Sequence, residues 1–359
     1  MPENAGLYKI LRIKKVNEPV KGFKLFILEG REPVPYKAGQ YLTLVNRTLT
    51  NPDQPAEAQE IRRSYSITSV PELNEPLSIG IKRIPNGFFS RLLVDHAEPG
   101  DELITTGAGG LFILPDDVSS YKQIFFFAAG SGITPVYALL KAALHLHPHL
   151  QVILIYSNRT PGTTIFLEEL KELQKQFPRR FKIEWLFSNT ADLSKARLYR
   201  ESLMQIVINN LLADHADTLY YICGPLSYMR MCTFVLQEMQ VSPAQIKREN
   251  FLIAQAPPPL PLPPDTRTHR ATIHFGSDTF KIPVHYPDSI LKAAKKQGIQ
   301  LPYSCETGRC ANCLAHCMKG QVWLSHNEVL TEKEVSNGLT LTCVGHPVGG
   351  DVELEIKKS

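Results

Sequence analysis

The sequence predicts a multidomain protein that joins three unlike folds: an antiparallel β-barrel, an open α/β sheet and a small α+β domain. Three observations support this prediction. Short strand-like segments separated by Pro and Gly turns fill the first third of the chain, strands alternate with helices in the middle third, and a run of prolines precedes a cysteine-rich last quarter. With 359 residues, the chain is long enough for two or three domains of ordinary size.

The composition is that of a globular protein, with 43% hydrophobic and 21% charged residues. The net charge of +4 is too small to indicate binding to nucleic acid or to a membrane surface. No apolar run reaches the length of a membrane span, and Met1 to Gly6 lack the apolar stretch of a secretory signal. We therefore expect a cytoplasmic protein with neither a nucleic acid nor a membrane as its partner.

The first domain, expected over residues 1–116, has the segment pattern of an antiparallel barrel. Short alternating segments bounded by turn residues are typical of such a barrel. The segments are Leu7–Val16, Lys24–Leu28, Tyr41–Val45, Ser64–Ile67 and Leu77–Lys82. Three motifs lie among them: Arg63-Ser64-Tyr65-Ser66, Ile81-Lys82-Arg83, and Gly87-Phe88-Phe89-Ser90 at the start of a helical stretch.

The second domain, expected over residues 117–252, alternates strands and helices. Ile124–Ala128 is a continuous apolar run, as a buried parallel strand should be, and it leads through Gly130-Ser131-Gly132-Ile133-Thr134-Pro135 into a helix over Val136–Leu146. A glycine turn between a strand and a helix lets phosphates approach backbone N–H groups, although tight turns alone also need glycine. The remaining units are strands Val152–Tyr156, Lys182–Leu186 and Tyr220–Ile222, a helix over Thr164–Gln176 and a helix through Met239. This pattern predicts an open α/β sheet with a ligand crevice at the carboxyl ends of its strands.

A proline-rich linker is expected over residues 253–268. Ala256–Pro264 reads A-P-P-P-L-P-L-P-P, and because proline has no amide hydrogen and a fixed φ, this segment is neither helix nor central strand. A ligand for an SH3-type domain is the alternative. The position of the segment just before a self-contained cysteine-rich domain favours an extended spacer.

The last domain, expected over residues 269–359, begins with two strands around a turn at Gly276-Ser277-Asp278. A helix follows, with Asp288 as its expected N-cap and Gly298 closing it in the left-handed conformation. The expected strands are Ala271–Phe275, Phe280–Val284, Leu339–Val344 and Val352–Ile356, and the expected helix is Ser289–Gln297. This order of elements predicts a small α+β domain.

Four cysteines in this domain predict an iron–sulfur cluster. Cys305, Cys310 and Cys313 have the spacing C-x4-C-x2-C, and Cys343 follows as a distant fourth, which is the pattern of plant-type [2Fe–2S] ligation. A structural zinc site is the alternative, but zinc sites usually use two C-x2-C pairs and this segment has one. Cys223, Cys232 and Cys317 are left over as reduced thiols.

The order of the motifs resembles the ferredoxin–NADP⁺ reductase superfamily. The motifs are R-x-Y-S at 63–66, G-x-x-S at 87–90, G-x-G-x-T-P at 130–135 and C-G-P at 223–225. With the C-terminal cysteine pattern, the whole chain is similar to single-chain oxygenase-type reductases that end in a plant-type ferredoxin of β-grasp fold, among them the reductase subunits of phenylacetyl-CoA epoxidases. Three further segments support the resemblance: Tyr156–Thr160, Tyr228-Met229 and Arg248–Phe251.

This resemblance implies a flavin site on the barrel. Arg63 is expected at the flavin pyrophosphate, where a planar guanidinium donates two hydrogen bonds. Tyr65 is expected against the flavin ring, Ser66 near its N5, and Phe251 over its face, although Phe251 fits equally well as a packed residue at the end of its domain. The implied flavin-binding residues are Arg63, Tyr65, Ser66, Ile81, Lys82, Gly87, Phe89, Ser90 and Phe251. We expect FAD, with FMN left open.

The resemblance also implies a nicotinamide nucleotide site on the α/β domain. Cys223 and Thr134 are expected near the nicotinamide, and together with Ser66 they are the residues implied at the reacting atoms. Arg159 favours NADPH over NADH by pairing with a 2′-phosphate, unless it is simply an exposed arginine; Cys223 fits equally well as a buried thiol at a strand end. The implied nucleotide-binding residues are Gly130, Gly132, Ile133, Thr134, Ser157, Asn158, Arg159, Gly224, Pro225 and Met229.

Together these features predict an NAD(P)H oxidoreductase that transfers electrons to another protein. Nicotinamides transfer two electrons as hydride and a [2Fe–2S] cluster accepts one, so a flavin is needed to connect them. The expected path is from NAD(P)H to FAD, then through the cluster to an oxygenase component. A diaphorase that reduces small acceptors and a redox sensor are the alternatives.

Overall fold

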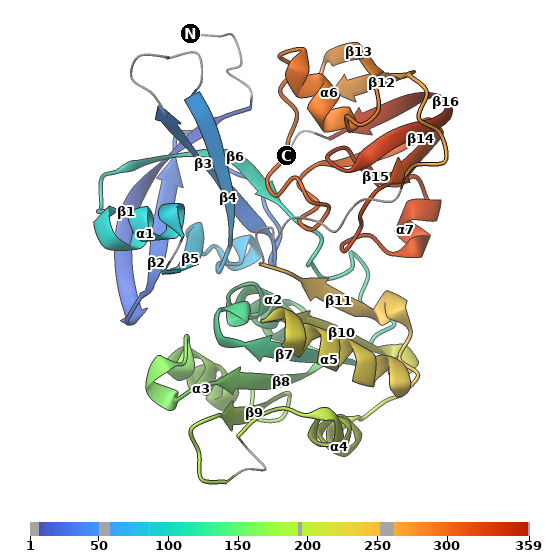
Figure 1. Cartoon of the computed structure of the whole chain (residues 1–359). Helices are drawn as coiled ribbons and strands as arrows, with labels where there is room; N and C mark the ends of the chain where they lie inside the picture. The colour runs from blue at the N-terminus through green and yellow to red at the C-terminus, as the bar shows by residue number, and fades with distance from the viewer. Residues whose placement is uncertain (1–6, 50–57, 86, 193–195, 252–261, 358–359) are drawn as a thin grey trace.

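The computed structural model describes residues 7–49, 58–85, 87–192, 196–251 and 262–357. Its strands form three sheets of six, five and five strands, which define a barrel domain, an α/β domain and a cysteine domain. Figure 1 shows the α/β domain below, with the barrel domain and the cysteine domain side by side above it. The predicted fold class is confirmed. None of the helices in the described ranges is both long and apolar enough to cross a membrane.

The barrel domain is an antiparallel sheet with the strand order β4-β3-β6-β1-β2-β5. A bridge between Ile67 and Ile79 links the end of β4 to β5 and closes the sheet on itself. Its interior is filled by alternating apolar residues such as Leu11, Ile13 and Leu42. The elements are β1 (Lys9–Val20), β2 (Phe23–Gly30), β3 (Tyr41–Leu49), β4 (Ala58–Ser66), η2 (Pro71–Leu73), β5 (Ser78–Lys82), α1 (Phe88–His96) and β6 (Glu102–Gly109).

The α/β domain is a parallel sheet with the order β11-β10-β7-β8-β9. Apolar clusters cover both faces of the sheet and bury the central strands almost completely, which explains the continuous apolar runs of those strands. After β7 the chain adds β8 and β9 on one side of that strand, and it later adds β10 and β11 on the other side. The carboxyl ends of β7 and β10 therefore form a topological switch point. The strands are β7 (Gln123–Ala129), β8 (Gln151–Asn158), β9 (Phe181–Phe187), β10 (Thr218–Cys223) and β11 (Ile246–Glu249).

The helices of this domain differ from the prediction at their starts. The helices are α2 (Ile133–Leu146), α3 (Leu167–Gln176), α4 (Arg200–Asn210) and α5 (Leu226–Glu238), with short turns η3 (Gly130–Gly132), η4 (Pro161–Thr163), η6 (His215–Asp217) and η7 (Pro243–Gln245). α2 begins three residues earlier than predicted, because Pro135 fits the first helical turn, where no N–H is needed. α3 begins at Leu167 rather than Thr164, and α4 was not predicted.

The cysteine domain has a mixed sheet with the order β13-β12-β16-β14-β15, in which β12 and β16 are parallel. α6 packs on this sheet through Ile290, Leu291 and Ala294. The elements are β12 (His269–Phe275), β13 (Asp278–Val284), α6 (Ile290–Lys296), β14 (Leu314–Leu324), α7 (Glu332–Ser336), β15 (Leu339–Leu341) and β16 (Gly345–Ile356). Residues 252–261, which hold most of the predicted linker, lie outside the described residues.

Several expectations for this domain were wrong in detail. Ser289 rather than Asp288 caps α6, since its Oγ accepts from Lys292 N, and Asp288 instead pairs with the ammonium groups of Lys292 and Lys296. β15 ends at Leu341 because the chain then turns to bring Cys343 beside Cys313, with Thr342 N donating to Cys313 O. β16 starts at Gly345, seven residues before the predicted Val352, and β14 and α7 were not predicted.

Candidate functional site at the meeting of three domains

A cavity of about 600 Å³ lies where the three domains meet, within the size range of small-molecule sites. The barrel domain forms one wall, and the carboxyl-terminal segment of the α/β domain forms a second. The third wall includes the cysteine loop, the segment that carries Cys305 and Cys310. Its lining includes Tyr41, Arg63, Ser64, Ser66, Glu249, Asn250, Phe251, Ser304, Cys305 and Cys310. The cavity therefore brings together residues from motifs that lie far apart in the sequence.

Ser66 has the environment of a ligand-binding hydroxyl. Its side chain is 3% exposed and its Oγ has no hydrogen-bond partner among the described residues. An unsatisfied buried hydroxyl costs about 1–3 kcal/mol, which a polar heterocycle such as a flavin would offset by accepting a hydrogen bond from it. Arg63 also lines the cavity, and its Nη1 donates to Arg62 O over 2.7 Å. These two residues fit the expected flavin.

Apart from Phe251, which lines the cavity, the remaining predicted flavin residues lie around β4 and β5. Tyr65 packs edge-on against Phe89 of α1, with 6.1 Å between ring centroids, and burial raises its pKa. Phe89 and Ile81 lie in the barrel core. The Ser90 hydroxyl accepts from Ile84 N and donates to Gly87 O, so it fixes the loop before α1. No acidic residue lies in the first turn of α1, which leaves its N–H groups suited to a phosphate.

The glycine turn after β7 packs directly on the end of β10. A Cβ on Gly132 would lie 2.1 Å from Cys223 O, so only glycine permits this approach. Gly130 has φ +54, and a Cβ there would lie 3.9 Å from the Lys82 ammonium of the barrel domain. The Thr134 hydroxyl donates to Ser131 O within the same turn. Gly130, Gly132, Thr134 and Cys223 are therefore brought together at the switch point.

Glu249 is a residue of this site that received no role from the sequence. It is the register partner of Cys223 on neighbouring strands β10 and β11, and it lines the cavity. Burial raises the pKa of its carboxyl group to about 8, and its Oε2 has no hydrogen-bond partner among the described residues. Burial also raises the pKa of the Cys223 thiol, which is 1% exposed. The feature that could have identified Glu249 is an acidic residue at the carboxyl end of a strand, beside the strand that ends in C-G-P.

The other nucleotide residues divide into polar and packing positions. At the end of β8, Ser157 Oγ and Asn158 Nδ2 are buried without hydrogen-bond partners among the described residues, which fits a polar ligand. Arg159 is exposed beside them. Ile133 and Met229 are buried in the apolar cores under α2 and α5, so the structure gives both a packing role. Gly224 and Pro225 connect β10 to α5.

The four cysteines of the predicted cluster form two pairs. Cys313 Sγ and Cys343 Sγ lie 3.1 Å apart, and the thiols of Cys305 and Cys310 share a hydrogen bond. That bond, with further bonds from Thr307, lowers the pKa of the Cys305 thiol and raises the pKa of the Cys310 thiol. No three metal-ligating side chains converge on a single point in the described residues.

This pairing separates the two metal-site alternatives. A mononuclear zinc site needs all four thiolates around one ion, whereas a [2Fe–2S] cluster offers each of its two irons to two cysteines. The residues present therefore fit the cluster. Cys305 and Cys310 line the cavity, whereas Cys313 and Cys343 are buried behind them. The Tyr41 hydroxyl of the barrel domain donates to Cys310 O.

Of the predicted site residues, the cavity contains Arg63, Ser66, Phe251, Cys305 and Cys310. Phe251 is 41% exposed at its rim. Tyr65, Cys223 and the glycine turn lie outside its lining, and the end of β8 lies farther along the same sheet edge. The structure therefore brings five of the predicted residues into one cavity, and it places the glycine turn, Cys223 and the end of β8 at the carboxyl ends of the parallel strands.

Three family models match the chain in the order of its domains. The oxidoreductase FAD-binding domain matches residues 8–113, the oxidoreductase NAD-binding domain matches residues 126–233, and the 2Fe-2S iron-sulfur cluster binding domain matches residues 273–348. FAD, a nicotinamide nucleotide and a [2Fe–2S] cluster are therefore the cofactors of these domains.

Known proteins of similar sequence belong to oxygenase systems. The chain is 30% identical over 343 residues to one of the subunits of 1,2-phenylacetyl-CoA epoxidase from Escherichia coli (strain K12), and the alignment covers 90% of each chain. It is 28% identical over 325 residues to the ferredoxin reductase component of 3-ketosteroid-9-alpha-monooxygenase from Mycobacterium tuberculosis (strain ATCC 25618 / H37Rv), covering 89% of this chain and 85% of that one. The solved phthalate dioxygenase reductase shares the fold, with a TM-score of 0.57, 20% identity, and coverage of 97% of this chain and 98% of that chain.

Proposed function

We infer the function from the premise that the chain belongs to the family of oxygenase reductases that join FAD-binding, NAD-binding and [2Fe–2S] domains in one polypeptide. It is an NAD(P)H oxidoreductase of the electron-transfer type. We propose that its electrons pass to a separate oxygenase component of the phenylacetyl-CoA epoxidase kind, that NADPH is the preferred donor, and that it works in the cytoplasm.

One observation carries the proposal: a single cavity has the flavin motif in one wall and two cluster cysteines in another. The bound flavin accepts a hydride and gives up single electrons, chemistry that the side chains themselves do not supply. The protein contributes position. Arg63 and the first turn of α1 are suited to the pyrophosphate, Ser66 offers a hydrogen bond, and Cys305 and Cys310, which line the cavity, would be two of the ligands of the cluster.

The side chains around the expected nicotinamide position are suited to exclude water rather than to transfer protons. Cys223 is a buried neutral thiol, and the Thr134 hydroxyl is used within its own turn. Glu249 is the one carboxyl group at this edge whose pKa is raised toward neutrality by burial. We propose that it stays protonated when the site is closed, so that no negative charge opposes the arrival of hydride.

Arg159 supports NADPH as the donor, because it is exposed beside unsatisfied Ser157 and Asn158 at the end of β8. A guanidinium there is free to pair with a ribose phosphate.

The test is an anaerobic absorption titration of the purified holoprotein. Addition of NADPH should bleach the flavin band and then the iron–sulfur band, and NADH should do so at higher concentration. Purified epoxidase component should then accelerate NADPH consumption strongly, whereas a diaphorase would show equal turnover with and without it. Failure of both nucleotides to bleach the flavin would contradict the proposal.

A further inference from the structure

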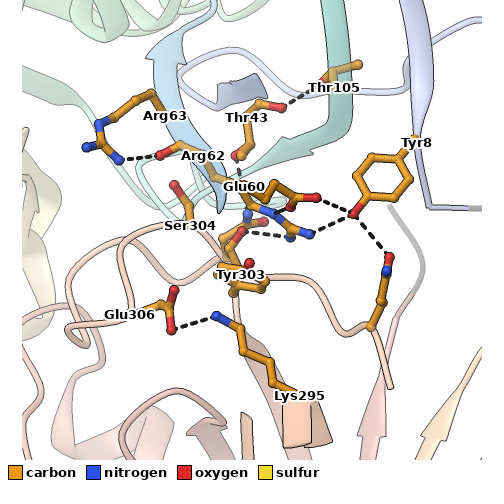
Figure 2. A network of polar contacts seen from close by, with 12 residues as sticks. Tyr8, Thr43, Glu60, Arg62, Arg63, Thr105, Lys295, Tyr303, Ser304 and Glu306 are labelled. Atoms are coloured by element: carbon orange, nitrogen blue, oxygen red, sulfur yellow. Dashed lines mark hydrogen bonds and ion pairs between the residues drawn. The ribbon is translucent and has the colours of Figure 1, made fainter. Parts of the chain in front are cut away.

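A partly buried polar network joins the barrel domain to the cysteine domain, and Figure 2 shows it from close by. At its centre lies Arg62, the residue before the proposed pyrophosphate ligand Arg63. We propose that Arg62 is a positioning residue that clamps the cysteine loop onto β4 and so sets the separation of flavin and cluster. This inference rests on the proposed function, because it concerns the electron transfer between these two cofactors.

Arg62 is buried to an extent that is unusual for arginine, with 4% exposure. Its Nε pairs with Glu60 Oε1 at 2.5 Å, and its Nη2 donates to the Tyr8 hydroxyl at 3.2 Å. Its Nη1 donates to Tyr303 O at 3.2 Å, which carries the contact into the cysteine domain. The Tyr8 hydroxyl in turn donates to Glu60 Oε2, and the side-chain amide of Gln300 lies within hydrogen-bond distance of the same hydroxyl, at 3.0 Å. The Arg62 charge is thus paired with Glu60 in the barrel domain, and the same guanidinium donates a hydrogen bond to the cysteine domain.

Tyr303 is held between two cations. The Arg62 guanidinium carbon lies 3.8 Å from the ring centroid, and Lys295 Nζ lies 3.6 Å from the same centroid. Lys295 Nζ also pairs with Glu306 Oε2 at 2.8 Å, and Glu306 follows the ligand Cys305 in the sequence. Because Tyr303 lies two residues before Cys305, fixing its ring and its carbonyl fixes the start of the cluster loop.

Strands β3 and β4 also contact the rest of the loop that carries Cys305, Cys310 and Cys313. Ser64 Oγ and Ser304 Oγ lie 2.8 Å apart, and Asn312 Nδ2 donates to Thr43 Oγ1 at 3.2 Å. Ser304 precedes Cys305, and Asn312 precedes Cys313. Every one of these barrel-side partners comes from β3 or β4, next to Arg63 and Ser66. One short stretch of strand therefore carries both the flavin contacts and the cluster contacts.

A role confined to barrel stability does not account for this arrangement. Glu60 on the same strand is enough to neutralise Arg62. The Arg62 guanidinium nevertheless also packs on the ring of Tyr303 in the cysteine domain. Successive residues of a strand point to opposite faces, so Arg62 and Arg63 serve different partners although they are neighbours. Figure 2 shows the two side chains pointing apart.

The test uses the full chain with both cofactors and the variants Arg62→Met, Tyr303→Leu and the double variant. Hydrogen–deuterium exchange over residues 299–304 measures docking without any turnover. Each single variant should exchange faster there by about tenfold or more, because truncating one partner of a buried charged contact is costly. Stopped-flow absorption with NADPH under anaerobic conditions measures the two redox steps separately.

Flavin reduction by NADPH should keep its wild-type rate, since hydride transfer does not involve the interface. The following step, in which reduced flavin loses one electron and one ferric iron becomes ferrous, should slow by about tenfold or more in each single variant. The slowing in the double variant should be smaller than the product of the two single effects, because both changes remove the same contact between the Arg62 guanidinium and the Tyr303 ring. The visible spectrum of the oxidised cluster should be unchanged in all three.

Arg180→Met is the matched control, because Arg180 donates to the carbonyls of Leu144, His147 and Leu150 within the α/β domain alone. It should alter neither exchange at 299–304 nor the second redox step. Should Arg62→Met fail to fold, Tyr303→Leu tests the same contact from the other domain. Wild-type exchange and wild-type cluster reduction in Tyr303→Leu, or additive slowing in the double variant, would overturn the clamp. A wild-type protein that NADPH does not reduce would instead overturn the proposed function and leave the exchange result standing.

Discussion

At the scale of single residues, the site separates charges by burial. Arg62 and Arg63 adjoin on β4 and both line the cavity, yet Arg62 is buried in a domain interface whereas Arg63 is only half-buried. The four cysteines were predictable because cluster ligation imposes a fixed spacing on the sequence. Glu249 and Arg62 were not, because a carboxylate or an arginine has no distinctive spacing, and its role depends on burial that only the fold creates.

Replacing Arg63 by Ala should weaken flavin binding by about 1.5–3 kcal/mol, the usual contribution of a hydrogen bond to a charged group. The expected change is in retention of FAD during dialysis, measured by absorbance per chain. Arg12→Ala is the control, because Arg12 is exposed on β1 and its Nε donates to Gly100 O. Equal retention in Arg63→Ala and wild type would show that the pyrophosphate lies elsewhere.

Replacing Cys343 by Ser should remove or destabilise the cluster while FAD stays bound. Cys343 is paired with Cys313 behind the cavity, so its loss leaves one iron with a single thiolate. Iron content and the visible spectrum measure the outcome, and Cys317→Ser is the control because Cys317 lies on β14 as a thiol with no part in either pair. A Cys343→Ser protein with a full, native-like cluster contradicts the ligand assignment.

Glu249 should make the stability of the α/β domain depend on pH. Its folded pKa is raised to about 8 from 4.5, so the folded state disfavours the ionised form. The stabilisation is complete below about pH 4.5 and is lost as the pH rises to about 8, at close to 1.4 kcal/mol per pH unit. In Glu249→Gln this slope should vanish.

The measurement is denaturant unfolding of Trp323→Phe protein, in which Trp185 on β9 is the one remaining tryptophan and reports on the α/β domain. Wild-type and Glu249→Gln backgrounds with the same pH slope would mean that Glu249 is ionised in the folded protein.

At the scale of elements, burial on both faces decided what the sequence could reveal. The strands β7, β8 and β10 were predicted because each is a continuous apolar run, and the glycine turn after β7 was predicted with them. β6 ends in Thr-Thr-Gly-Ala-Gly and α4 has little amphipathic pattern, so neither was found. β14 was missed because its burial comes from long-range pairing with β16, which local residues do not encode.

Gly132→Ala should destabilise the switch point. The new Cβ would lie 2.1 Å from Cys223 O and 2.5 Å from its carbonyl carbon, so the turn or β10 must move. Overpacking of this kind costs about 1–3 kcal/mol. We expect a lower midpoint for thermal unfolding of the α/β domain and weaker binding of NADPH. Gly162→Ala is the matched control, since a Cβ there meets nothing within 4 Å and its φ is not positive; an equal effect of both substitutions would exclude the close approach as the cause.

At the scale of the whole molecule, three cores meet around one cavity. The apolar core of the cysteine domain is built from residues 271–356, with Leu7 and Leu111 as its partly buried contacts from the barrel side. Among the described residues, the apolar cores of the barrel and α/β domains contain no residue of the cysteine domain. The sequence predicted three domains because each has its own strand period and its own motifs. It did not predict how they dock, because the docking contacts, polar and apolar alike, are single residues from distant segments.

A chain ending at Phe251 should therefore fold, bind FAD and reduce a small dye with NADPH, but reduce cytochrome c poorly. The flavin and nucleotide motifs precede Pro257 and the cluster cysteines follow Pro264, so the truncation removes the one-electron outlet and keeps both sets of motifs. The cost falls on the interface, where Tyr41, Arg62 and Leu111 lose their partners in the cysteine domain. Rates per bound flavin with the dye and with cytochrome c measure the split. Full-length Cys343→Ser is the control that lacks the cluster but keeps the interface covered. If both proteins reduce the dye equally well, the domains are independent; if only the truncated chain loses dye reduction, the cysteine domain is part of the flavin site, as its share in the cavity wall allows.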